Sequence, residues 1–218
     1  MLSMRWQLVV AWLLVGSAGP VVAGQLLVQV SDGAGRAVAD AVVTVTPLAT
    51  TAPSPVAAPV VRYVDQRDET FIPYVQVVHP GDSVVFRNSD GTRHHAYSFS
   101  AAKAFEFLLR PGESSPPITL ERAGLVAVGC NIHDHMVAYL VISPAQAKVT
   151  PARGQVVFEH LPAGRYMVKV WHPQLRPGPT QPELVQTVGA QATSQRADFT
   201  LSLLPDPRAS ADREHMDY

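Results

Sequence analysis

Hydrophobic positions in this chain of 218 residues gather in short segments, and glycine or proline separates one segment from the next. Valine, threonine and aromatic residues fill these segments, which is typical of strands; examples are 75–78, 83–86, 125–128 and 166–170. After the N-terminal region no long segment keeps a helical period, although 101–109 could form a short turn of helix or an irregular crossing. The pattern predicts an all-β protein built as a sandwich rather than an α/β protein.

The first 23 residues predict a cleaved secretory signal. Arg5 precedes an apolar segment, Leu8–Val15, and the small-residue ending Val21-Val22-Ala23 follows it. The apolar segment is too short to span a membrane as a helix, and no cysteine stands at the cut to carry a lipid. We therefore expect a periplasmic or secreted protein that is not inserted in a membrane after the signal is removed.

The composition divides the rest of the chain into blocks. A linker rich in proline, alanine and threonine at 47–60 precedes a central block at 61–143, which is long enough for one small β-sandwich. The flanks, 24–46 and 150–204, each contain a strand, a turn and a second strand, and neither can bury a core alone. We therefore expect the flanks to pair. The polar segment 205–218 predicts a flexible tail.

The candidate chemistry centres on the only cysteine, Cys130, which His133 and Met136 follow closely. In an oxidising compartment a lone cysteine must be buried, paired with another chain or bound to a metal. A thiolate, an imidazole and a thioether are the ligands expected at a blue-copper site, which also needs a second histidine. The segment after a turn-forming run offers two candidates, His94 and His95.

Each of these residues also has an ordinary structural explanation. A buried cysteine behaves as a small hydrophobic residue, a methionine fills core space, and a histidine in a loop is usually exposed. Their occurrence together favours a copper site over these separate explanations.

The near balance of 17 basic and 18 acidic side chains gives no support to nucleic-acid binding. The chain lacks a Ser-His-Asp arrangement, a phosphate-binding glycine loop and a zinc-type cysteine set, so we expect no enzyme.

The central block resembles the cupredoxin family, which includes plastocyanin and amicyanin, in three places. Val77–Asn88 matches the strand, PGD turn and strand that lead to the first histidine, and Ala123–Cys130 matches the strand that ends at the cysteine. Arg93–Ala96 matches the place where relatives commonly have His-Asn-Val. The C-x-x-H-x-x-M spacing is that of the short-loop, amicyanin-like members. The chain looks most similar to periplasmic proteins labelled methylamine utilisation proteins.

This resemblance implies a Greek-key β-sandwich that holds one type 1 copper ion. It makes His94, Cys130 and His133 the equatorial ligands and Met136 the axial ligand. The function implied is one-electron transfer between exported redox proteins, with a c-type cytochrome or a dehydrogenase as the partner.

Two histidines depart from the family pattern and leave a second function open. His95 stands where relatives often have asparagine, and His135 adds a further imidazole beside the ligand loop. Each could support a ligand or replace one. The alternative is a copper carrier or sensor whose site is not blue and uses these extra histidines.

The flanks resemble a carboxypeptidase-regulatory-like module, which is a small transthyretin-like β-sandwich. This resemblance implies that the copper block is inserted in a discontinuous second domain. Two sandwiches that follow each other in sequence, and a β-sandwich interaction module without redox function, are the alternatives. The matching residues are Gly35, Val38, Ala41, Val43, Gly154, Phe158, Leu161, Pro162, Gly164 and Tyr166.

Overall fold

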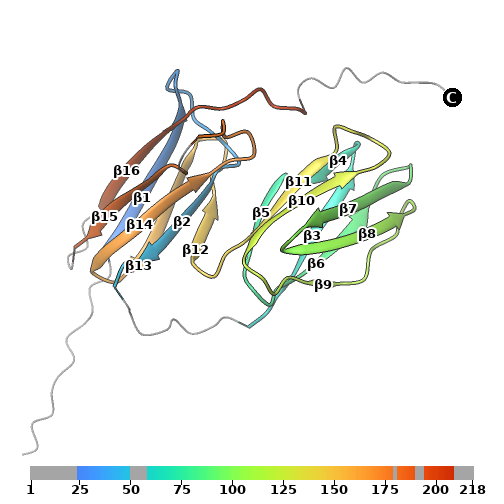
Figure 1. Ribbon diagram of the computed structural model, residues 1–218, viewed down its shortest axis with the longest axis horizontal. Helices are drawn as coiled ribbons and strands as arrows, with labels where there is room; N and C mark the ends of the chain where they lie inside the picture. The colour runs from blue at the N-terminus through green and yellow to red at the C-terminus, as the bar shows by residue number, and fades with distance from the viewer. Residues whose placement is uncertain (1–23, 50–57, 179–180, 190–193, 209–218) are drawn as a thin grey trace, which may run out of the picture.

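The computed structural model describes residues 24–49, 58–178, 181–189 and 194–208, and every regular element in these ranges is a β-strand. Four sheets form two sandwiches that lie side by side (Figure 1). The predicted all-β fold class is confirmed. The predicted signal and most of the predicted linker and tail lie outside the described residues. Within the described ranges we find no helix long and apolar enough to cross a membrane.

The central sandwich contains the strands of the predicted copper block. One sheet has the order β5-β11-β10-β7-β8 and the other β4-β3-β6-β9. Its core includes Val64, Phe86, Val126 and Leu140, which have no exposed surface. The strands are β3 (Val61–Arg67), β4 (Thr70–Ile72), β5 (Val75–Val78), β6 (Ser83–Asn88), β7 (His94–Ser100), β8 (Lys103–Leu109), β9 (Ile118–Thr119), β10 (Gly124–Cys130) and β11 (Val137–Ile142).

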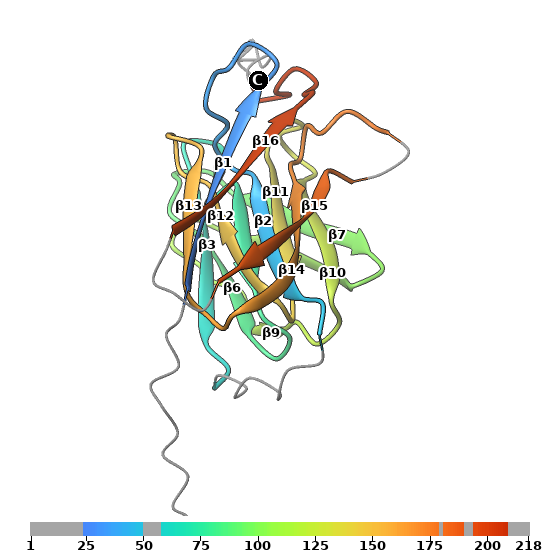
Figure 2. The same cartoon turned by 90° about the vertical axis from the view of Figure 1, so that its left-hand side faces the viewer.

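The flanking sandwich is built from both ends of the described chain, because β1 pairs with β13 and β16. Its sheets have the orders β13-β1-β16 and β12-β2-β14-β15, and Figure 2 shows β1 between β13 and β16. Its family stays a prediction. The strands are β1 (Gly24–Asp32), β2 (Val42–Pro47), β12 (Gln146–Val149), β13 (Gln155–Leu161), β14 (Gly164–Trp171), β15 (Glu183–Val188) and β16 (Ser194–Leu201).

Strand β8 corrects the expectation of a helical turn or irregular crossing at 101–109. It pairs with β7 along its whole length. Phe105 and Phe107 point to the central core, where their rings lie 5.1 and 6.4 Å from that of Phe86. Leu108 is apolar but exposed on the opposite face, so the sequence lacks a clean alternation of apolar and polar positions. Pairing with β7 decides the conformation.

An apolar cluster joins the two sandwiches. The outer faces of β5 and β11 pack against β2, β12 and β14, with Val42, Tyr74 and Val75 buried between them. The rings of Tyr139 and Trp171 meet edge to face at 5.6 Å. The outer face of the five-stranded sheet is therefore covered by the flanking sandwich at β5 and β11.

Asp82 secures the PGD turn that precedes β6. Its side chain is almost fully buried, and its two oxygens accept hydrogen bonds from the amides of Val60 and His79 and from the Arg62 guanidinium, each at 3.0 Å. Burial alone would raise the pKa of Asp82, but these hydrogen bonds and the Arg62 charge outweigh it and hold the pKa below its usual value. The carboxylate is therefore ionised at neutral pH.

We expect Asp82→Asn to lower the free energy of unfolding by about 1–3 kcal/mol at pH 7, because one acceptor and the charge are lost. Urea unfolding of both proteins at several pH values measures this free energy. A carboxylate with a lowered folded pKa stabilises fully above its unfolded pKa of about 3.9 and less as pH falls through the folded pKa. The difference between wild type and variant should thus shrink in acid. Asp198→Asn, at an exposed ion pair with Arg196, is the control; equal losses in the two variants would contradict this assignment.

Candidate metal centre

Strand β7 separates the two adjacent histidines onto opposite faces of the sheet. Successive side chains of a strand alternate between faces. His94 has no exposed surface and faces the core, as Ala96 does. The His95 side chain lies on the outer face, where its Nε2 is 2.8 Å from Glu106 of β8. The structure thus brings only the first histidine of the pair to the inside of the sandwich.

Strand β10 and the loop after it carry the two predicted sulfur ligands and the second imidazole. Cys130 is the last residue of β10, is buried, and pairs with Ala96 of β7. The loop closes tightly: the Cys130 amide donates to the Met136 carbonyl at 3.1 Å, and the Met136 amide donates to the His133 carbonyl at 3.0 Å. Met136 is buried in the same core cluster as Cys130.

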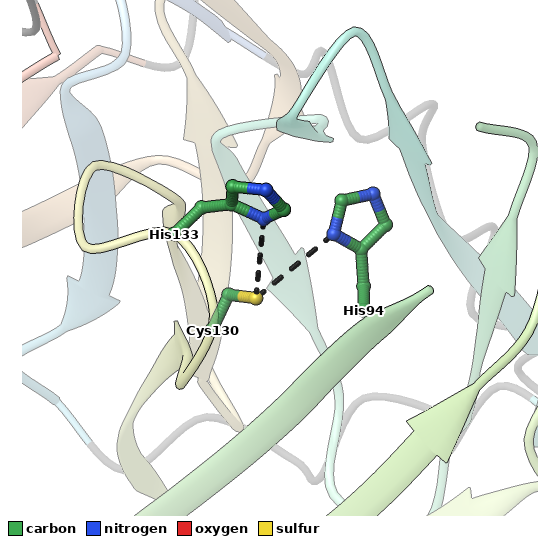
Figure 3. Close-up of side chains that lie close together, drawn as sticks. All are labelled: His94, Cys130 and His133. Carbon is green, nitrogen blue, oxygen red and sulfur yellow. Dashed lines mark hydrogen bonds between the residues drawn. The ribbon is translucent and has the colours of Figure 1, made fainter. Parts of the chain in front are cut away.

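Three of the four predicted ligands meet at one point (Figure 3). The Cys130 Sγ lies 4.0 Å from the Nδ1 of His94 and 3.9 Å from the Nδ1 of His133. All three donor atoms lie within 4.8 Å of one another. Donors of these types make bonds of about 2.0–2.3 Å to a small ion, so both sulfur–nitrogen distances are within reach of one ion. A soft sulfur with two imidazoles fits copper.

Asp90 orients the buried histidine from outside. Its carboxylate oxygen lies 2.7 Å from the Nε2 of His94 and also accepts the Glu69 amide at 3.0 Å, while its other oxygen accepts the Asp68 amide at 2.6 Å. Burial alone would raise the pKa of Asp90, but the hydrogen bonds from Glu69, His94 and Asp68 outweigh it and lower the pKa. An ionised Asp90 accepts the Nε2 hydrogen, which leaves the Nδ1 lone pair of His94 free for a metal.

Glu69 lies next to two histidines of the loop after β10. Its two carboxylate oxygens lie 3.7 Å from the Nε2 atoms of His133 and His135. Burial lowers the pKa of His133, and the Glu69 charge opposes this effect without cancelling it. The neutral imidazole that a metal ligand requires is therefore favoured at neutral pH. His135 contributes no donor atom to the group of three.

Asp90 and Glu69 are parts of the centre that the sequence pattern does not predict. At Asp90 the sequence predicts only the turn before His94. The spacing of four residues between Asp90 and His94 was the one local signal, since an Asx-rich turn often folds back on its own chain. Glu69 gave no signal, because its contacts reach residues more than sixty positions away.

Comparison with solved structures aligns parts of the chain with copper proteins. A Cu-containing nitrite reductase from Thermus scotoductus SA-01 aligns with TM-score 0.36 and 24% identity over 45% of this chain and 25% of its own. A purple cupredoxin from Nitrosopumilus maritimus aligns with TM-score 0.34 and 18% identity, over 38% and 99%. A reduced Cu(I) form of an amicyanin mutant aligns with TM-score 0.36 and 19% identity, over 46% and 98%.

The chain thus spans about a quarter of the length of that nitrite reductase. Neither a family model nor a curated protein matches the chain. The TM-scores are too low for these likenesses to support a conclusion about the site.

We expect Asp90→Asn to weaken copper binding by about 10- to 100-fold, because the amide cannot hold His94 and both turn amides as the carboxylate does. Competition titration with a chromophoric chelator measures the affinity. Asp65→Asn is the control, since Asp65 is a partly buried carboxylate of β3 that contacts Ser89 but no histidine. Equal affinities of the two variants would show that Asp90 does not support the ligand.

Proposed function

We propose that this protein is an exported type 1 copper protein that carries single electrons between exported redox partners. One observation carries the proposal: a buried cysteine sulfur and two imidazole Nδ1 atoms converge from β7, β10 and the loop after β10. The buried Met136 at the end of that loop is the proposed axial ligand. Copper in such a site supplies a one-electron couple between its cupric and cuprous states.

The surrounding residues suit electron transfer because they fix the donors and exclude water. His94 and Cys130 are buried, so water has little access to a metal bound between them. The backbone hydrogen bonds of the loop hold His133 and Met136 close to Cys130. The His133 side chain is 20% exposed, whereas that of His94 is completely buried. We propose that His133 is the route by which electrons enter and leave.

The positions of His95 and His135 help to distinguish an electron shuttle from a copper carrier or sensor. The His95 side chain points away from the three donor atoms and binds Glu106. His135 lies next to Glu69 rather than beside Cys130. These placements support the shuttle. The proposed partner is another exported redox protein, such as a c-type cytochrome or a dehydrogenase, and the protein itself is not proposed to be an enzyme.

We expect wild-type protein loaded with one equivalent of cupric ion to show the intense blue band of a thiolate ligand, and Cys130→Ser to lose it, because a serine oxygen cannot give that charge transfer. Visible absorption with metal analysis measures both. Stoichiometric uptake with a pale or red spectrum in the wild type would favour the carrier or sensor. Absence of stoichiometric uptake would favour the interaction module.

His94→Gln and His95→Gln form a matched pair on neighbouring positions of β7. We expect the blue band and tight copper binding to be lost in His94→Gln, because its Nδ1 is one of the three converging donors. His95→Gln should keep both, since only the contact with Glu106 is lost. Absorption and electron paramagnetic resonance of the two loaded variants test this. Loss of the band in His95→Gln alone would overturn the ligand assignment.

A further inference from the structure

Glu69 stands beside the one ligand ring of the group of three that reaches solvent. The Nδ1 of His133 faces Cys130, and its opposite nitrogen, Nε2, faces the Glu69 carboxylate at 3.7 Å. The Glu69 side chain is 42% exposed, so its charge acts both on the ring and on whatever approaches it. We infer that Glu69 selects the redox partner by charge and favours one that presents cationic groups around its redox centre. The inference rests on the proposed electron-carrier function.

The backbone holds Glu69 in this place. Asp68 and Glu69 form the two-residue turn between β3 and β4, and both have left-handed φ values, 50° and 52°. Residues other than glycine, asparagine, aspartate and histidine rarely adopt this conformation, so at Glu69 it persists because its surroundings impose it. The nearly buried Asp90 carboxylate accepts both amides of the turn. The position of the Glu69 charge is therefore set by a restrained turn.

The neighbouring cations are already neutralised. Arg67, at the start of the same turn, binds Asp65 at 3.1 Å. Arg208, which lines a small cleft with Asp68 and His135, binds Asp206 at 2.6 Å. Among the described residues, no arginine or lysine pairs with the Glu69 carboxylate, whose ionic contacts are with the His133 and His135 rings, each at 3.7 Å. A negative charge therefore remains at the electron route.

Charges at the edge of a contact surface act mainly on the rate of encounter and its dependence on salt. A carboxylate beside His133 attracts a cationic oxidant or reductant to the ring through which the electron passes, and repels an anionic one. In the proposed step one electron moves from the reduced carrier to a cationic oxidising protein, which is reduced by one electron, and no proton or group is transferred. Glu69 acts on the encounter that precedes this step.

The test compares Glu69→Gln with Glu106→Gln, which removes the same charge from another histidine contact on the outer face of β8. Reduced, copper-loaded proteins are oxidised by a cationic complex, tris(phenanthroline)cobalt(III), and by an anionic one, hexacyanoferrate(III). We expect Glu69→Gln to lower the ratio of the cationic to the anionic rate several-fold at low salt, and Glu106→Gln to leave it close to wild type. The difference should fade as salt screens the charges.

A second readout needs no copper. The paramagnetic cation hexaamminechromium(III) should broaden the NMR signals of Glu69, His133 and His135 in the metal-free wild type and in Glu106→Gln, and should not do so in Glu69→Gln. Equal rate ratios in all three proteins, or no broadening at these residues in the wild type, would overturn the inference. The wild-type result stands even if Glu69→Gln fails to fold. A wild type that takes up no copper would instead overturn the proposed function.

Discussion

The pairing of β7 with β10 is the constraint on which the metal centre depends. Cys130 lies opposite Ala96, and this register places the cysteine and His94 on the inner face of the same sheet. Because side chains alternate along a strand, a slip of β7 by one residue would turn His94 outward and His95 inward. The apolar residues that precede Cys130 in β10, buried at Val126 and Val128, hold the register by packing in the core. Core packing and ligand placement are therefore one requirement.

Two carboxylates, Asp90 and Glu69, lie next to the ligand histidines on the side away from Cys130. Asp90 accepts hydrogen bonds from the His94 ring and from the amides of the β3–β4 turn, so one nearly buried carboxylate links a ligand to the second sheet of the sandwich. Asp68 and Glu69 in this turn have left-handed φ values, which are unfavourable for residues other than glycine. A conformation of this kind costs of order 1–3 kcal/mol for each residue, which charge-assisted hydrogen bonds to Asp90 can offset. The strained turn is also the one that carries Glu69, whose carboxylate lies next to the His133 ring.

The sequence alone predicted the parts of this molecule that local patterns encode. The short valine-rich segment of β10 and the spacing of Cys130, His133 and Met136 are local, and so are the strand-turn-strand patterns of the flanks. Strand β8 was missed because Phe105, Phe107 and Leu108 place apolar side chains on both faces. The roles of Asp90 and Glu69 were missed because they depend on the turn between β3 and β4 folding against the loop before β7, which no local period records.

The position of the flanking sandwich adds a last physical link. Strand β11 begins directly after Met136, and its outer face packs against the flanking sandwich through Tyr139 and Trp171. Each end of the ligand loop is thus part of a paired strand, and β11 is packed on both faces, since Leu140 faces the central core. A loop whose two ends are held in packed strands has little freedom to open. The discontinuous second sandwich therefore restrains the strand that carries the metal loop, which is a structural reason for inserting one sandwich into the other.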